Sequence, residues 1–157
     1  MRSEIAIDVA APAELVFRLA RDVERWPDLL PHYARADRSG DADERGRLLV
    51  RFVARRPLVP VLGLALPVAW RSWTWSDPTG CRLRFLHRGG ATSGMDVTWR
   101  IEPIDGETRV TIEHVFTPRL PGWAAFIDRF FTRPIAGRTL ASFKAIAEAV
   151  AAEDLAR

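Results

Sequence analysis

From residue 81 to residue 116, apolar and polar side chains alternate through three successive stretches that turn residues separate. The residues on the apolar side are, in chain order, Leu83, Phe85, His87, Met95, Val97, Trp99, Ile101, Val110, Ile112, His114 and Phe116. Strict alternation is typical of an antiparallel strand with one buried face. The pattern therefore predicts a sheet whose apolar face must be covered by another part of the chain.

Shorter alternating stretches precede these three, and together they predict about seven strands. Pro12 opens a run of helical spacing, and Asp22 is expected to cap a second short helix. Residues 121–155 predict a long C-terminal helix that Pro134 kinks or restarts. Because only this helix is long enough to cover the sheet, we predict one α+β domain over residues 1–157. A curved sheet against one helix leaves room for an apolar pocket.

Charge and cysteine content narrow the range of possible partners and locations. The formal net charge is +3, from 23 basic and 20 acidic residues with no run of like charge, so we expect no nucleic-acid partner. Cys81 is the single cysteine and excludes an internal disulfide. The N-terminus lacks a signal-peptide pattern and no apolar run reaches membrane-spanning length, so the expected location is cytoplasmic.

Three segments resemble a known family. They are "IDVAAPAELVFRLARDVERWPDLLPHY", "TSGMDVTWRIEPIDGETRVTIEH" and "IAGRTLASFKAIAEAV". Together they resemble the START-like polyketide cyclase/dehydrase proteins of the SRPBCC superfamily, over nearly the whole chain. The resemblance implies a helix-grip fold, with a curved sheet around the C-terminal helix, two short helices after the first strand, and a ligand cavity. It implies no single activity, because members include aromatase/cyclases and lipid or quinone carriers.

The stretch "VAWRSWTWSDPTG" separates its tryptophans by face. Alternation places Trp70 with Ser72 and Thr74, and Trp73 with Trp75 on the other side. Aromatase/cyclases of the resembled group carry a Trp-x-Ser pattern pointing into the cavity, often followed by an arginine where this chain has Thr74. We therefore expect the first face to line the pocket. The proline-broken segment 57–67 is expected to cover the two outer tryptophans.

The candidate catalytic residues are polar side chains expected at the pocket: Tyr33, Ser72, His87 and His114. Each has an alternative interpretation as a core residue with a satisfied hydrogen bond. The predicted ligand-binding residues are Trp26, Tyr33, Phe52, Trp70, Ser72, Thr74, Phe85, His87, Trp99, His114, Thr139 and Phe143. The histidines and Cys81 do not form a metal-ligand pattern, and no phosphate-loop or nucleophile-elbow motif occurs, so no metal or cofactor is expected.

Three functions remain open at this level, one of them a binding protein whose ligand controls a partner protein; the other two are more specific. In the first, a hydrophobic, oxygen-bearing small molecule enters the cavity and is cyclised or dehydrated as a polyketide, delivered by an acyl carrier protein. In the second, the protein is a non-catalytic lipid or quinone carrier of the coenzyme Q-binding type. Segment Leu58 to Leu66 could then touch a membrane.

Overall fold

The structure is a computed structural model that describes residues 1–59 and 64–156. Its strands are β1 (Arg2–Val9), β2 (Tyr33–Arg38), β3 (Leu48–Val59), β4 (Leu64–Asp77), β5 (Arg82–Arg88), β6 (Asp96–Ile104) and β7 (Glu107–Val115). Its helices are α1 (Ala13–Arg21), the 3₁₀ turn η1 (Val23–Arg25), α2 (Trp26–Leu29), α3 (Trp123–Ile127), the π-helical turn η3 (Asp128–Thr132) and α4 (Arg133–Leu155).

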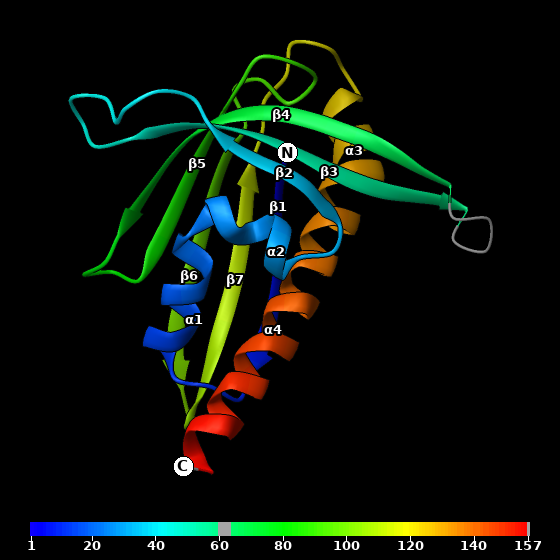
Figure 1. The fold of residues 1–157 in the computed structure, drawn as a ribbon. Coiled ribbons are helices and arrows are strands. Elements are labelled where there is room, and N and C mark those ends of the chain that lie inside the picture. The colour runs from blue at the N-terminus through cyan, green and yellow to red at the C-terminus, as the bar shows by residue number, and fades with distance from the viewer. Residues whose placement is uncertain (60–63, 157) are drawn as a thin grey trace.

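The strands of the described chain form one seven-stranded antiparallel sheet in the order β1-β7-β6-β5-β4-β3-β2. The sheet curves, α4 crosses its concave side, and α1 and α2 cover part of the same side (Figure 1). The hairpin of β3 and β4 reaches past the rest of the sheet on the side of α3 (Figure 1). This is the helix-grip arrangement that the family resemblance implies, so the fold prediction is confirmed.

Trp26 lies at the centre of the core, between the sheet and α4. Its ring centroid is 5.2–5.8 Å from those of Tyr33, Phe52, Phe85, Trp99 and Phe143. The indole Nε1 donates to Ala20 O at 3.0 Å, so the only polar atom of this buried side chain is satisfied. The short helices are thus held on the sheet by one aromatic side chain.

The pairing of β3 with β4 confirms the predicted division of the tryptophans. Trp70 lies opposite Phe52, and the register holds without a shift through Ser72 and Thr74. Phe52, Ser72 and Thr74 are buried on the concave side, whereas Trp73 and Trp75 are half-buried on the other. A one-residue slip would have exchanged the two faces.

The prediction that segment 57–67 covers the outer tryptophans is wrong. Its described residues continue β3 and β4, and Pro57 pairs with Ala65. Ala65 is eight residues along β4 from Trp73, a distance of roughly 26 Å in a strand. Arginines cover the indoles instead: the Arg47 guanidinium carbon lies 5.2 Å from the Trp73 ring centroid and 6.0 Å from that of Trp75. Arg84 lies 5.5 Å from the Trp75 centroid.

The C-terminal helix is continuous but changes its winding before Pro134. The turn η3 is π-helical, and the backbone N–H of Arg133 donates to Asp128 O. Pro134 follows directly after this turn, at the start of α4, and has no N–H to donate to the preceding turn. A proline inside an α-helix clashes with the carbonyl four residues earlier, and a wider turn relieves that crowding. The predicted irregularity at Pro134 therefore takes the form of a π turn.

Candidate ligand-binding pocket

A cavity of about 140 Å³ lies between the concave face of the sheet and the α3–η3–α4 helix. It is lined by Trp26, Tyr33, Phe52, Val68, Ala69, Trp70, Phe85, His87, Ala91, Thr92, Met95, Val97, Trp99, Ile112, His114, Ile127, Phe131, Thr132, Ile135, Ala136 and Thr139. Most of this wall is aromatic or aliphatic. An engineered protein cavity of about 150 Å³ with such a wall stays dry and admits benzene. The cavity therefore accommodates one ring-sized apolar group as it stands.

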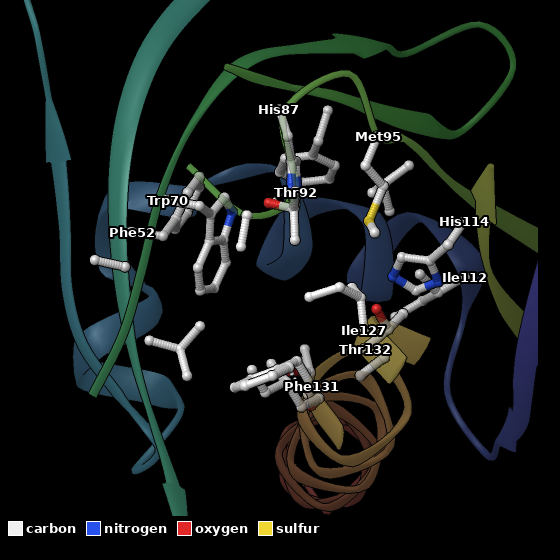
Figure 2. Close-up of a pocket in the computed structure, with 18 of the residues that line it drawn as sticks. Phe52, Trp70, His87, Thr92, Met95, Ile112, His114, Ile127, Phe131 and Thr132 are labelled. Carbon is white, nitrogen blue, oxygen red and sulfur yellow. Dashed lines mark hydrogen bonds between the residues drawn. The ribbon is translucent and has the colours of Figure 1, made fainter. Parts of the chain in front are cut away.

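His87 projects into this apolar space from β5 (Figure 2). A hydrogen bond of 2.8 Å joins its Nδ1 to Thr92 Oγ1, and its ring stacks on Trp70 with a centroid distance of 5.8 Å. Burial lowers the pKa of His87 to about 3, and the nearby His114 adds to the effect. The imidazole is therefore uncharged at neutral pH, with an orientation fixed by Thr92 and Trp70.

His114 enters from β7, near Met95 and Thr132 (Figure 2). Burial lowers its pKa to about 4; the Asp128 carboxylate opposes this shift and the Arg133 guanidinium adds to it. Its Nδ1 is buried, and no polar group of the described residues lies within hydrogen-bonding distance. An unpartnered buried nitrogen costs roughly 1–3 kcal/mol, which a ligand oxygen could recover by hydrogen bonding.

A third set of polar side chains, His32, Tyr33 and Thr139, connects the segment after α2 with α4. His32 Nε2 and Thr139 Oγ1 are 2.9 Å apart, and the rings of His32 and Tyr33 are 4.9 Å apart. Burial lowers the pKa of His32 to about 4 and raises that of Tyr33. The Thr139 hydroxyl also donates to Ile135 O at 2.9 Å. Tyr33 and Thr139 thus give the wall a neutral phenol and a hydroxyl whose hydrogen bonds are already made.

Neutral imidazoles and hydroxyls in an apolar wall favour an uncharged ligand that carries oxygen atoms over a charged ligand. Each neutral imidazole has one N–H donor and one nitrogen acceptor. They can orient a carbonyl or hydroxyl group of a ligand whose remaining surface is apolar. Among the described residues, no group of three or more His, Cys, Asp or Glu side chains is arranged to hold a metal ion.

The mouth of the cavity lies between loop 89–94 and α3. Gly89 and Gly94 flank the turn with φ values of +73° and +85°, which favour glycine, and so hold Thr92 against His87. The Trp123 indole Nε1 donates to Ala91 O at 3.0 Å and joins the two sides. This contact is the point at which the mouth would widen for a larger ligand.

Nine of the twelve predicted ligand-binding residues lie on the wall: Trp26, Tyr33, Phe52, Trp70, Phe85, His87, Trp99, His114 and Thr139. Ser72, Thr74 and Phe143 are buried on the correct side but do not line it. Ser72 is short and donates to Trp73 O at 3.1 Å, and Thr74 packs deeper in the sheet opposite Leu48. Phe143 instead packs against Trp26 and Trp99. Ser72 thus lies opposite His87 in the sheet without itself lining the cavity.

Sequence reasoning missed several wall residues. Met95, Val97 and Ile112 share the apolar faces already identified, so the same alternation could have included them. Thr92 lies in a loop, where no periodicity applies. Ile127, Phe131 and Thr132 belong to α3 and the π turn. An α-helical pattern places the side chains of a π turn incorrectly.

The predicted membrane contact through Leu58 to Leu66 falls largely outside the described residues. Of this segment, the side chain of Leu66 is exposed. Within residues 1–59 and 64–156, no helix is both long and apolar enough to cross a bilayer.

Solved structures with this fold are numerous. A di-domain aromatase/cyclase, BexL from the BE-7585A biosynthetic pathway, is 28% identical with a TM-score of 0.69. The match covers 92% of this chain and 45% of that chain, so this protein spans about half of its relative. The Zhui aromatase/cyclase from Streptomyces sp. R1128 is 22% identical, with a TM-score of 0.73 and coverage of 94% and 93%. A START superfamily protein from Mycobacterium smegmatis is 14% identical, with a TM-score of 0.69 and coverage of 95% and 98%.

The grip of a curved sheet on one helix, with an apolar cavity between them, defines a START-like ligand-binding protein. The chain belongs to the family described as polyketide cyclase / dehydrase and lipid transport, whose model matches residues 1–148. No sequence of a curated protein matches the chain significantly. Family and fold together support a role in binding a hydrophobic ligand.

Proposed function

We propose that this protein is an aromatase/cyclase that folds an apolar, oxygen-bearing chain inside the cavity and promotes its aldol cyclisation and dehydration. The observation that carries the proposal is a pair of uncharged imidazoles, His87 and His114, in a wall that is otherwise mostly apolar. The likeness to the di-domain aromatase/cyclase BexL supports the same class of reaction.

The reaction needs few groups from the protein. A proton leaves a carbon between two carbonyl groups, that carbon bonds to a distant carbonyl carbon, and the carbonyl oxygen takes up a proton. Loss of water then leaves a double bond. Because a pKa of about 4 makes His114 a weak base, its main contribution is a hydrogen bond to the reacting carbonyl. The shape of the cavity supplies the larger effect, by bringing the two carbons together.

In this proposal the imidazoles take over the role of a cavity arginine, which is to polarise a carbonyl group. Thr74 occupies the position where the resemblance implies a cavity arginine, and no Lys or Arg of the described residues lines the cavity. Polarisation of a carbonyl therefore falls to His114 and to the His87–Thr92 pair.

The polyketide chain would arrive on an acyl carrier protein, whose acidic surface suits the net charge of +3 on this protein.

A lipid or quinone carrier is the second candidate. It is favoured by exposed aromatic side chains on α3 and η3, where Phe126 and Phe130 are 42% and 40% exposed. The family description also includes lipid transport. A carrier needs the same wall but no turnover, so the two candidates differ in whether the ligand leaves the protein chemically changed.

Reconstitution with a minimal polyketide synthase that supplies a carrier-bound poly-β-ketone separates the two candidates. Wild-type protein should shift the products towards one cyclised, dehydrated compound, measured by liquid chromatography and mass spectrometry. The variant His114→Phe should lose this shift and still bind an apolar fluorescent probe. Identical products with and without wild-type protein would overturn the cyclase proposal. A phospholipid or quinone recovered from the purified protein in equimolar amount would establish the carrier instead.

A further inference from the structure

A second cleft lies on the helical side of the molecule, beside the cavity. It is lined by Arg56, Ala125, Asp128, Arg129, Phe130 and Arg133. Arg56 comes from β3, near the end of its hairpin, and the others come from α3, η3 and the start of α4. The cleft thus holds three guanidinium groups and one carboxylate, in contrast to the uncharged cavity next to it.

The single carboxylate of this cleft is engaged through one oxygen, Oδ2, whereas Asp128 Oδ1 is buried without a hydrogen-bond partner among the described residues. Arg133 Nε donates to Asp128 Oδ2 at 2.8 Å. The two residues are five apart, whereas neighbours on one face of an α-helix are three or four apart. The π turn brings them together. Because one guanidinium is neutralised in this way, the charge of Arg56 and Arg129 remains unbalanced.

Arg56 has unmade hydrogen bonds in a partly buried position. Its guanidinium carbon lies 5.8 Å from the ring centroids of both Phe130 and Phe131, and its Nε is buried without a partner. Neither Arg56 nor Arg129 forms an ion pair with any carboxylate of the described residues. A buried donor without an acceptor is costly, so this cleft is poised for an anion that the chain itself does not supply.

The cleft and the cavity share one wall. Phe131 lines the cavity and its ring also lies beside the Arg56 guanidinium. Figure 2 shows Phe131 at the helical side of the cavity. Because the cavity of about 140 Å³ holds a ring-sized group, a longer ligand must extend beyond it. A ligand chain that leaves the cavity beside Phe131 would reach the arginines of the cleft.

We propose that the cleft of Arg56, Arg129 and Arg133 binds a phosphate group at the outer end of a ligand whose apolar part occupies the cavity. The inference rests on the proposed ligand-binding function and adds the chemistry of the ligand's exposed end. Planar guanidinium groups donate paired hydrogen bonds to phosphate oxygens, and such charge-assisted bonds are about twice as strong as neutral ones. The ligand is therefore an anionic amphiphile or a phosphate-linked carrier arm.

Matched amphiphiles test this inference. Decanol and decyl phosphate, below their micelle concentrations and at constant ionic strength, are titrated while tryptophan fluorescence is recorded. Wild-type protein should bind decyl phosphate at least about tenfold more tightly than decanol. Arg129→Gln removes an exposed arginine without an ion pair, and Arg56→Gln removes the stacked one. Both should reduce the preference several-fold, and Arg129→Gln should leave the affinity for decanol unchanged.

The control variant is Arg51→Gln, which makes the same charge change on the outer face of β3. It should keep the wild-type preference. An equal affinity for both amphiphiles in wild type, or the same loss in Arg51→Gln as in Arg129→Gln, would overturn the inference.

Inorganic phosphate distinguishes a headgroup site from a site for free anions. As a competitor, it should weaken the binding of decyl phosphate and leave decanol unaffected. If neither amphiphile binds but phosphate binds to wild type and not to Arg129→Gln, the proposed function fails and only an anion site remains. If decanol binds and phosphate competes with nothing, the cavity stands and the anion site fails.

Discussion

Acid should destabilise this protein well before its carboxylates are protonated, because its three histidines are buried without charge. The pKa is about 3 for His87 and about 4 for His32 and His114, against about 6.5 in an unfolded chain. These folded-state values are depressed, so the unfolded state binds protons first. The contribution of each histidine to stability is complete above about pH 6.5 and falls as the pH drops below that value.

The size of the effect follows from the two pKa values. For a group that titrates at 6.5 unfolded and at 4 folded, the free energy of unfolding is lower by about 2 kcal/mol at pH 5 than at pH 7.5. His87 gives nearly the same figure, because both folded values lie below pH 5. The three sum to about 6 kcal/mol, a large part of the 5–15 kcal/mol typical of a domain.

Urea unfolding at pH 7.5, 6.0 and 5.0, followed by tryptophan fluorescence, measures this difference. In His114→Gln the drop between pH 7.5 and 5.0 should be about 4 kcal/mol instead of about 6. Asp8, Asp43 and Glu148 also have altered pKa values, but theirs are lowered from 3.8 or 4.5. Each of these carboxylates stabilises the fold at pH values above its pKa in the unfolded chain, and this stabilisation is lost only at lower pH. The change in the free energy of unfolding between pH 7.5 and 5 therefore comes mainly from the histidines.

An unchanged pH dependence in His114→Gln would refute the reasoning, since it would mean that His114 titrates alike in both states. The nitrogen chemical shifts of His114 provide an independent readout. They should show a neutral ring down to about pH 5 in the folded protein. A charged ring at pH 6 in the folded protein would equally contradict a depressed pKa for His114.

Three further changes should have distinct effects on stability. Trp26→Ala removes the centre of the aromatic core and should cost about 3–5 kcal/mol in urea unfolding. Thr92→Val leaves the Nδ1 of His87 without its partner and should cost about 1–3 kcal/mol, with a shift of the His87 ring resonances. Arg47→Ala exposes Trp73 and should shift tryptophan emission to the red, at a cost of about 1 kcal/mol.

Much of the fold could be predicted from the sequence because the dominant pattern is local. Alternation with a period of two identifies each strand and also its buried face, since neighbouring side chains must point to opposite sides. This is why the faces of Trp70 and Trp73 could be separated, and why His87 and His114 could be placed inward. Proline, cap and helical-spacing signals predict the order of the helices, and the family resemblance implies how they are arranged around the sheet.

The limits of the candidate site have a physical reason. Alternation predicts the side of the sheet on which a residue lies, but not how close that residue comes to the cavity. It therefore places Ser72 and Thr74 on the cavity side, although neither of them lines the cavity. Contacts between distant segments leave no local periodicity. For that reason the arginines over the outer tryptophans, and the pairing of Thr92 with His87 across a loop, could not be read from the pattern.

The π turn has a consequence for how such a pocket can change. A π turn closes with an i→i+5 hydrogen bond, so it fits one more residue into a turn than an α-helix does, and the helix continues beyond it in nearly the same phase. Removing one residue from Asp128–Thr132 and restoring α-helical winding would therefore keep Ile127 and Trp123 near their present positions. It would mainly change which side chains of the turn itself face the cavity, so the count of residues in the turn selects that part of the wall.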